Sequence, residues 1–167
     1  MYTGHFGIAL AGKGIDSRMP LWILITAAFA PDLVISLSQL LGGIDKKAIE
    51  PIISSVVGGF GLALVVSIIY FVWKYDFAGS ILLGLVSFLH TIADLITGRS
   101  HLWPGGPETG LHLYQYGYVD FALESSLVVA GWLLYQRSLP KETQRIWAAW
   151  AILGFLILLQ LYFEIRP

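Results

Sequence analysis

Four ionisable side chains interrupt stretches of the chain that are otherwise strongly apolar: His5, Asp32, His90 and Asp94. His90 and Asp94 are four residues apart, a spacing that places both on one face of a helix. The chain has no cysteine, so a metal ion would be held by imidazole nitrogens and carboxylate oxygens, a mixed set that suits zinc and other divalent metals. We therefore predict that these four side chains bind a divalent metal ion, with zinc as one candidate.

A second pair of carboxylates, Asp120 and Glu124, repeats the four-residue spacing further along the chain. A charged side chain inside a membrane costs about 2.5–3.5 kcal/mol on insertion scales, so such residues are expected to have a function or a partner. Three hypotheses stay open. The carboxylates and imidazoles bind a metal ion, or they bond across helices and pair with histidine and arginine to fix the structure, or they line a path for protons or ions.

The composition indicates that all these groups lie in a membrane protein. The chain has 167 residues, of which 56% are hydrophobic and 13% charged, and its mean hydropathy is +0.72. Soluble domains are about 25% charged, and so small a globule cannot bury this much apolar surface. The net charge of −1 provides no basic surface for nucleic acid. We predict one integral membrane domain over residues 1–167. Its expected partner is membrane lipid, and no binding of nucleic acid is expected.

Five stretches are long and apolar enough to cross a membrane, which takes about 20 helical residues. They cover residues 20–41, 51–73, 77–97, 118–136 and 146–163. Residues 4–13 form an apolar run that is too short to cross, and we expect it to be a half-helix that pairs with the first span around a turn at 14–19. The predicted fold class is all-α, a polytopic transmembrane bundle of five spanning helices plus a short N-terminal half-helix.

The helical rise of 1.5 Å per residue converts these spans into depths below one membrane face. Asp94 is expected about 5 Å deep, His90 about 10 Å, Glu124 about 9 Å and Asp32 about 14 Å. Pro31 should also bend the first span, which membrane helices tolerate mainly where the backbone lines a cavity. The spans therefore predict a cleft of acids and imidazoles near one face.

Lysine and arginine counts orient this cleft. The opposite face carries six such residues against four on the cleft's own face, and basic residues are more frequent on the cytoplasmic side. The six are Lys13, Arg18, Lys74, Arg137, Lys141 and Arg145, and the four are Lys46, Lys47, Arg99 and Arg166. The cleft is predicted to face outward.

A polar loop over residues 98–117 follows Asp94 directly. Its Pro-Gly and Gly-Gly steps predict turns, and its tryptophan and tyrosines favour the membrane surface, so the loop is a candidate lid. Arg99 and His101 are the predicted substrate or lid residues, because a cation there could meet a phosphate group or neutralise Asp94. The alternative is that both side chains are solvated or pair with nearby carboxylates. His112 is a weaker candidate.

The motifs occur in a distinctive order: GHFGIALAGK at 4–13, APDL at 30–33, LHTIADLITG at 89–98 and LWPGG at 102–106. This order resembles the bacterial membrane-bound metal-dependent hydrolase-like family of small multi-pass proteins, and the likeness runs from the amino terminus through the helix that contains Glu124. The resemblance implies a location in the bacterial inner membrane. It also implies that Glu124 corresponds to a carboxylate that related proteins have on the same helix. It also implies metal ligands at His5, Asp32, His90 and Asp94.

The chain departs from that family at two positions. Ser54 stands where family members have a histidine, and Gly98 replaces the last histidine of H-x3-D-x3-H. A catalytic zinc site needs three protein ligands, an open position for water and a base. The resemblance therefore implies a metal-dependent hydrolase with a reduced ligand set, in which Asp94 or Glu124 is the catalytic base and metal-bound water attacks a membrane-proximal ester or phosphoester.

The alternative function belongs to a different class. The chain would be a non-catalytic multi-pass subunit whose polar core is structural. It would pack into a larger membrane complex or a homo-oligomer through its second and fifth spans, which carry no charged residue. Substituting His90 or Asp94 separates the two functions, because it should abolish metal binding and activity in the first and only loosen folding or assembly in the second.

Overall fold

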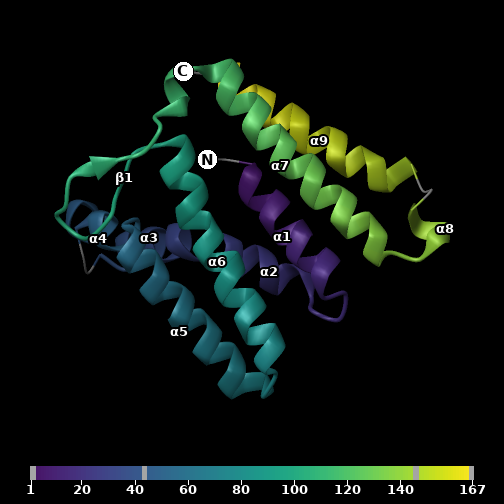
Figure 1. Ribbon diagram of the computed structural model, residues 1–167, viewed down its shortest axis with the longest axis horizontal. Helices are drawn as coiled ribbons and strands as arrows, with labels where there is room; N and C mark the ends of the chain where they lie inside the picture. The colour runs from purple at the N-terminus through teal and green to yellow at the C-terminus, as the bar shows by residue number, and fades with distance from the viewer. Residues whose placement is uncertain (1–2, 43–44, 145–146, 166–167) are drawn as a thin grey trace. The chain divides into compact units, whose positions relative to one another are not determined.

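The computed structural model describes residues 3–42, 45–144 and 147–165, and these residues are predominantly helical (Figure 1). The helices are α1 (Gly4–Ile15), α2 (Leu21–Ala28), α3 (Ala30–Leu40), α4 (Lys46–Ile53), α5 (Val56–Lys74), α6 (Phe77–Thr97), α7 (Gly117–Ser138), α8 (Lys141–Gln144) and α9 (Trp147–Ile165). A two-stranded antiparallel sheet of β1 (Ser100–His101) and β2 (Glu108–Thr109) follows α6, and a 3-10 turn, η1 (Leu113–Gln115), precedes α7. The all-α prediction is confirmed.

The chain forms two compact units. Met1–Ile25 and Leu113–Pro167 make up the first, called here the terminal unit, and Thr26–His112 make up the second, called the central unit. The terminal unit therefore contains α1, α7, α8 and α9, and the central unit contains α3 to α6 with the β1–β2 hairpin.

Three of the described helices are long and apolar enough to cross a membrane: α5, α6 and α7. The predicted span 77–97 coincides with α6, and the predicted span 118–136 lies within α7. Large apolar side chains of α5 are exposed along its length, including Phe60, Ile68 and Val72, as expected for a helix that contacts lipid. The described helices are thus compatible with a membrane location.

The predicted first span, 20–41, is not one straight helix. It is divided into α2 and α3, which are bent by 71° at the break and form either a broken span or a re-entrant loop. Pro31 lies in the first turn of α3, where proline is tolerated because its missing N–H would have no helical partner. The bend expected at Pro31 is present, and it is sharper than a kink within one helix.

The predicted second span, 51–73, is also interrupted. α4 ends at Ile53 and α5 begins at Val56, because Ser55 caps the new helix: its hydroxyl accepts from the Gly58 backbone N–H at 3.0 Å. The segment after α6 lies against this break, with the Val57 N–H donating to the Leu102 carbonyl at 3.1 Å.

Five spans are therefore not confirmed. Among the described residues there are three candidate spans, or four if the bent pair counts as one. The described apolar part of α9, Trp150–Tyr162, is shorter than a span. Ile146, the start of the predicted fifth span, lies outside the described residues, as do Arg145 and Arg166 from the orientation count.

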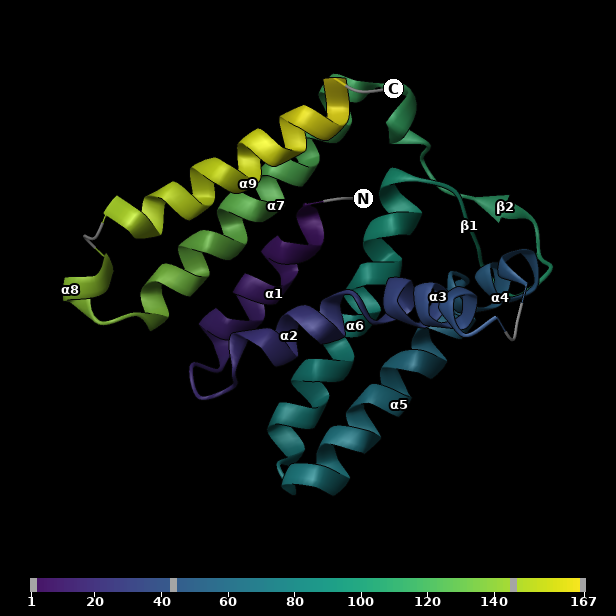
Figure 2. The ribbon, with the colours of Figure 1, turned by 180° about the vertical axis from the view of Figure 1, so that it is seen from behind.

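Glycines bring α1 and α7 together in the terminal unit (Figure 2). A Cβ on Gly131 would lie 2.0 Å from the Gly7 carbonyl oxygen, and a Cβ on Gly7 would lie 2.5 Å from the Leu127 carbonyl oxygen, so the backbones touch only because these residues lack side chains. Beside this contact, Leu10, Val128, Trp132 and Leu156 form a buried apolar core. The short first helix is confirmed as α1, but its principal partner is α7 rather than the next span in sequence.

Candidate metal centre

His90 is held in one orientation within the central unit. It lies on α6, its side chain is 2% exposed, and its Nδ1 is 2.8 Å from the Ala28 carbonyl oxygen. Since a carbonyl only accepts hydrogen bonds, Nδ1 must carry the hydrogen and donate it. The carbonyl is available because α2 ends at Ala28, so the helix break supplies the acceptor that fixes the ring.

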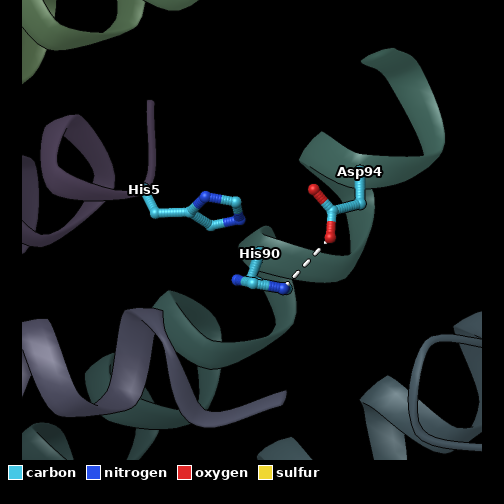
Figure 3. Close-up of side chains that lie close together, drawn as sticks. All are labelled: His5, His90 and Asp94. Carbon is cyan, nitrogen blue, oxygen red and sulfur yellow. Dashed lines mark ion pairs between the residues drawn. The ribbon is translucent and has the colours of Figure 1, made fainter. Parts of the chain in front are cut away.

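The other ring nitrogen of His90 faces two carboxylates. Its Nε2 is 3.1 Å from Asp94 Oδ2 and 3.8 Å from Asp32 Oδ1 (Figure 3 draws the Asp94 pair). With the hydrogen on Nδ1, a bare lone pair on Nε2 would repel these oxygens. The arrangement is therefore favourable when a proton or a metal ion lies between the nitrogen and the oxygens.

The backbone explains why these three side chains meet. His90 and Asp94 are one helical turn apart on α6. Asp32 lies in the first turn of α3, where the unpaired N–H groups favour a carboxylate, and α3 starts there because of the break after Ala28. The two acids are partly exposed, 31% for Asp94 and 55% for Asp32, whereas the His90 side chain that they face is buried.

Glu124 and His5 lie in the terminal unit. Glu124 is fully buried, and its Oε2 accepts from the backbone N–H groups of Thr3 at 2.8 Å and Gly4 at 3.0 Å. A carboxylate of α7 therefore caps the first turn of α1, satisfying donors that have no helical partner. His5 follows on α1 with its side chain fully buried. The base role of Glu124 and the ligand role of His5 stay predictions.

The Glu124 contact is extended by a glutamine of α9. Thr3 donates its hydroxyl to Gln160 Oε1 at 2.8 Å, and both residues are buried. Asp120, one turn before Glu124 on α7, is buried as well. These contacts join residues up to 157 positions apart, so no local sequence signal could have indicated them.

The predicted lid residues bond within their own hairpin. Arg99 donates from Nε to His112 Nδ1 at 2.7 Å and lies 3.6 Å from Glu108, while His101 Nδ1 is 2.8 Å from the Gly106 carbonyl oxygen. Arg99 is thus paired with a nearby carboxylate, as in the alternative considered for it, and that carboxylate is Glu108. The lid and substrate roles stay predictions.

Comparison of the chain with protein-family models, with curated proteins and with solved structures found no match. The resemblance to the metal-dependent hydrolase-like family therefore rests on the motifs alone.

The two positions where that family has histidine make backbone contacts here. Ser54 ends α4, and its carbonyl accepts from the Ser100 hydroxyl. Gly98 ends α6, and its carbonyl lies so close to Gly110 that a Cβ on Gly110 would be 2.2 Å away. Both residues terminate helices and anchor the loop that follows α6.

One participant in the centre could not be named from the sequence. The Ala28 carbonyl orients His90, but a backbone group leaves no mark in a residue pattern. Pro31, three positions later, was the available signal, because a proline predicts a helix break and a break frees carbonyl groups.

Proposed function

We propose that Asp32, His90 and Asp94 form the core of a divalent metal site, with zinc as one candidate, in a membrane-bound hydrolase that acts on an ester or phosphoester at the membrane surface. The observation that carries the proposal is the orientation of His90: Nδ1 is anchored on the Ala28 carbonyl while Nε2 faces two carboxylates. Metal-binding histidines almost always donate their second N–H to a carbonyl or carboxylate in this way.

The residues of the proposed site have different roles as metal ligands and as a base. A bound divalent metal would lower the pKa of a coordinated water so that it becomes a nucleophile near neutral pH. His90 would provide Nε2 as a ligand, with its ring held by the contact between Nδ1 and the Ala28 carbonyl, and Asp32 would provide an oxygen from α3. Asp94 is the better placed of the two predicted bases, because it is partly exposed beside His90, whereas Glu124 Oε2 is occupied by two backbone N–H groups.

His5 enters this proposal from the sequence, as a second imidazole ligand. The inner-membrane location and the outward orientation also enter from the motifs and the charge count. Three helices that are apolar enough to cross a membrane support the location in general terms.

The proposal is tested by elemental mass spectrometry of detergent-purified protein. Wild type should contain about one divalent metal per chain, and His90→Ala and Asp94→Ala should lose it. His112→Ala is the matched control, since that histidine is bonded to Arg99 in the loop, and it should keep the metal. His5→Ala tests the further ligand separately. Wild type that stays free of metal after supplementation with zinc, manganese and iron would refute the site.

A second candidate function is favoured by the closed contacts of the terminal unit. The Glu124 carboxylate accepts from two backbone N–H groups at the start of α1, so a buried acid in this chain can have a structural role. In this alternative the His90–Asp94 pair is likewise structural, and the protein is a non-catalytic multi-pass subunit or a homo-oligomer. Wild type would then contain no bound metal, and His90→Ala would lower the melting temperature.

A further inference from the structure

The end of α7 carries a cavity that is separate from the candidate metal centre. It has a volume of about 350 Å³ and is lined by Leu133, Gln136, Arg137, Gln144 and Trp150. These residues belong to the terminal unit and come from the last turns of α7, from α8 and from the start of α9 (Figure 1). Because α7 is one of the three candidate spans, its end should lie at the depth of the lipid headgroups.

The cavity wall contains a buried donor that needs an acceptor. Gln136 is only 7% exposed, and its amide nitrogen has no hydrogen-bond partner among residues 3–42, 45–144 and 150–162. Buried amide groups are almost always bonded, so an unpaired one beside a cavity indicates a missing partner. Arg137, the next residue, is exposed and forms no ion pair with a carboxylate in the described part of the chain.

Gln144 and Trp150, the other polar residues of the wall, form hydrogen bonds within the terminal unit. Gln144 donates its amide N–H to the Leu139 carbonyl at 2.8 Å, and the Trp150 indole N–H donates to the Gln144 carbonyl at 3.2 Å. The Trp150 ring also packs edge-on against Trp132, with ring centroids 6.1 Å apart. The wall is thus fixed by its own contacts, and the groups left to meet a ligand are an amide donor, a guanidinium and the apolar surfaces of Leu133 and Trp150.

We propose that this cavity binds the phosphodiester headgroup of an anionic phospholipid. Phosphate oxygens are acceptors that match the forked guanidinium of Arg137 and the amide of Gln136. Leu133 and Trp150 provide the apolar wall that a glycerol backbone and the first acyl carbons require, and tryptophan favours this depth of the bilayer. Residues 137–145 contain three basic residues and one acidic residue, a balance that attracts anionic lipid.

The test is a lipid titration followed by native mass spectrometry of the full chain in detergent. The probes are dioleoylphosphatidylglycerol, dioleoylphosphatidylcholine and inorganic phosphate. Wild type should bind phosphatidylglycerol about tenfold more tightly than phosphatidylcholine, and Arg137→Gln should lose about tenfold of that affinity. Arg137→Lys should lose less, because it keeps the charge but not the fork. His90→Ala should bind the lipid as wild type does, which separates this site from the proposed metal centre.

Lys74→Gln is the matched control, because Lys74 also ends a candidate span but lies over the Trp73 ring, 3.9 Å from its centroid. It should leave phosphatidylglycerol binding unchanged, and equal losses in the Lys74 and Arg137 variants would overturn the proposal. So would equal binding of the two lipids by wild type, or unchanged binding by Arg137→Gln. If inorganic phosphate binds as tightly as the lipid and requires Arg137, the ligand is a free anion and the lipid proposal is wrong. Circular dichroism confirms that each variant is folded.

Discussion

Both units contain carboxyl groups spaced one helical turn apart from a second ionisable residue, but the groups that contact these carboxyls differ. In the terminal unit, Glu124 is fully buried and one oxygen accepts from two backbone N–H groups. In the central unit, His90 is also buried, but its Nε2 faces two partly exposed carboxyl groups. The first arrangement joins a carboxylate to two backbone donors, whereas the second places an imidazole nitrogen against two carboxylates. Helix-spaced acids therefore do not by themselves indicate a site, and the chemistry of the groups that meet them decides their role.

The largest effect should come from removing the Glu124 cap. Glu124→Ala leaves the buried Gly4 N–H without its acceptor and leaves the Thr3 N–H with only the longer bond to Gln160 Oε1 at 3.3 Å. Since an unsatisfied buried donor costs about 1–3 kcal/mol, the free energy of unfolding should fall by roughly 1–4 kcal/mol. Glu124→Gln keeps an acceptor oxygen and should lose less. Thermal unfolding in detergent measures both, and equal melting temperatures for all three proteins would contradict the capping role.

The next effect tests how the break before α3 orients His90. Pro31→Ala restores an N–H that favours a continuous helix and should draw the chain away from the break that presents the Ala28 carbonyl. Loss of an orienting partner of a metal-binding histidine typically costs about 10–100-fold in metal affinity. Competition with a chelator measures that affinity. Pro140→Ala, in the loop between α7 and α8, is the matched control and should bind metal as wild type does.

A smaller effect should follow from filling the backbone contact of the terminal unit. A Cβ on Gly131 would lie 2.0 Å from the Gly7 carbonyl oxygen, so Gly131→Ala should force α1 and α7 apart at a cost of about 1–3 kcal/mol. Gly154→Ala is the control, since a Cβ there would meet nothing within 4 Å beyond its chain neighbours and the adjacent backbone of α9 in the described part of the chain. That substitution should be neutral or slightly stabilising, because alanine favours a helix. Equal stability of the two variants would show that α1 and α7 do not depend on this close approach.

The smallest effect concerns the turn after α1. The pKa of Asp16 is lowered from its ordinary value of 3.8, chiefly by a hydrogen bond from the Arg18 side chain. Burial raises this pKa, but its effect is smaller. The folded protein therefore favours the ionised carboxylate of Asp16. The stabilisation of the folded state by this carboxylate is present above about pH 4 and is lost as pH falls through the lowered pKa. Because Arg18 is exposed, the pair contributes only about 0.2–1 kcal/mol.

Melting curves between neutral and acidic pH test this contribution. Asp16→Asn should lower the melting temperature slightly at neutral pH and show a smaller further loss on acidification than wild type. Parallel pH profiles for the two proteins would contradict the prediction.

Some features of the fold followed directly from residue order. The stretch 77–97 is predominantly apolar between Asp76 and Gly98, and α6 has these bounds, with Asp76 capping its first turn at the Gly79 N–H. The spacing of His90 and Asp94 put both on one face of that helix, and Pro31 indicated a bend. The break at Ser55 was not predicted, because serine can lie within an apolar helix or cap a new one, and the difference depends on what packs beside it.

By itself, the sequence determined the helical class, the apolar spans α6 and α7, and the neighbourhood of His90 and Asp94, since each depends on composition or on contacts one helical turn apart. Tertiary structure alone decided that α1 packs on α7, that Glu124 caps α1, and that Arg99 pairs with Glu108 and His112. For each of these contacts, several residues of the chain have the chemistry to be the partner. They depend on which backbones approach one another, and that follows from packing over more than 100 residues of chain in the case of Glu124.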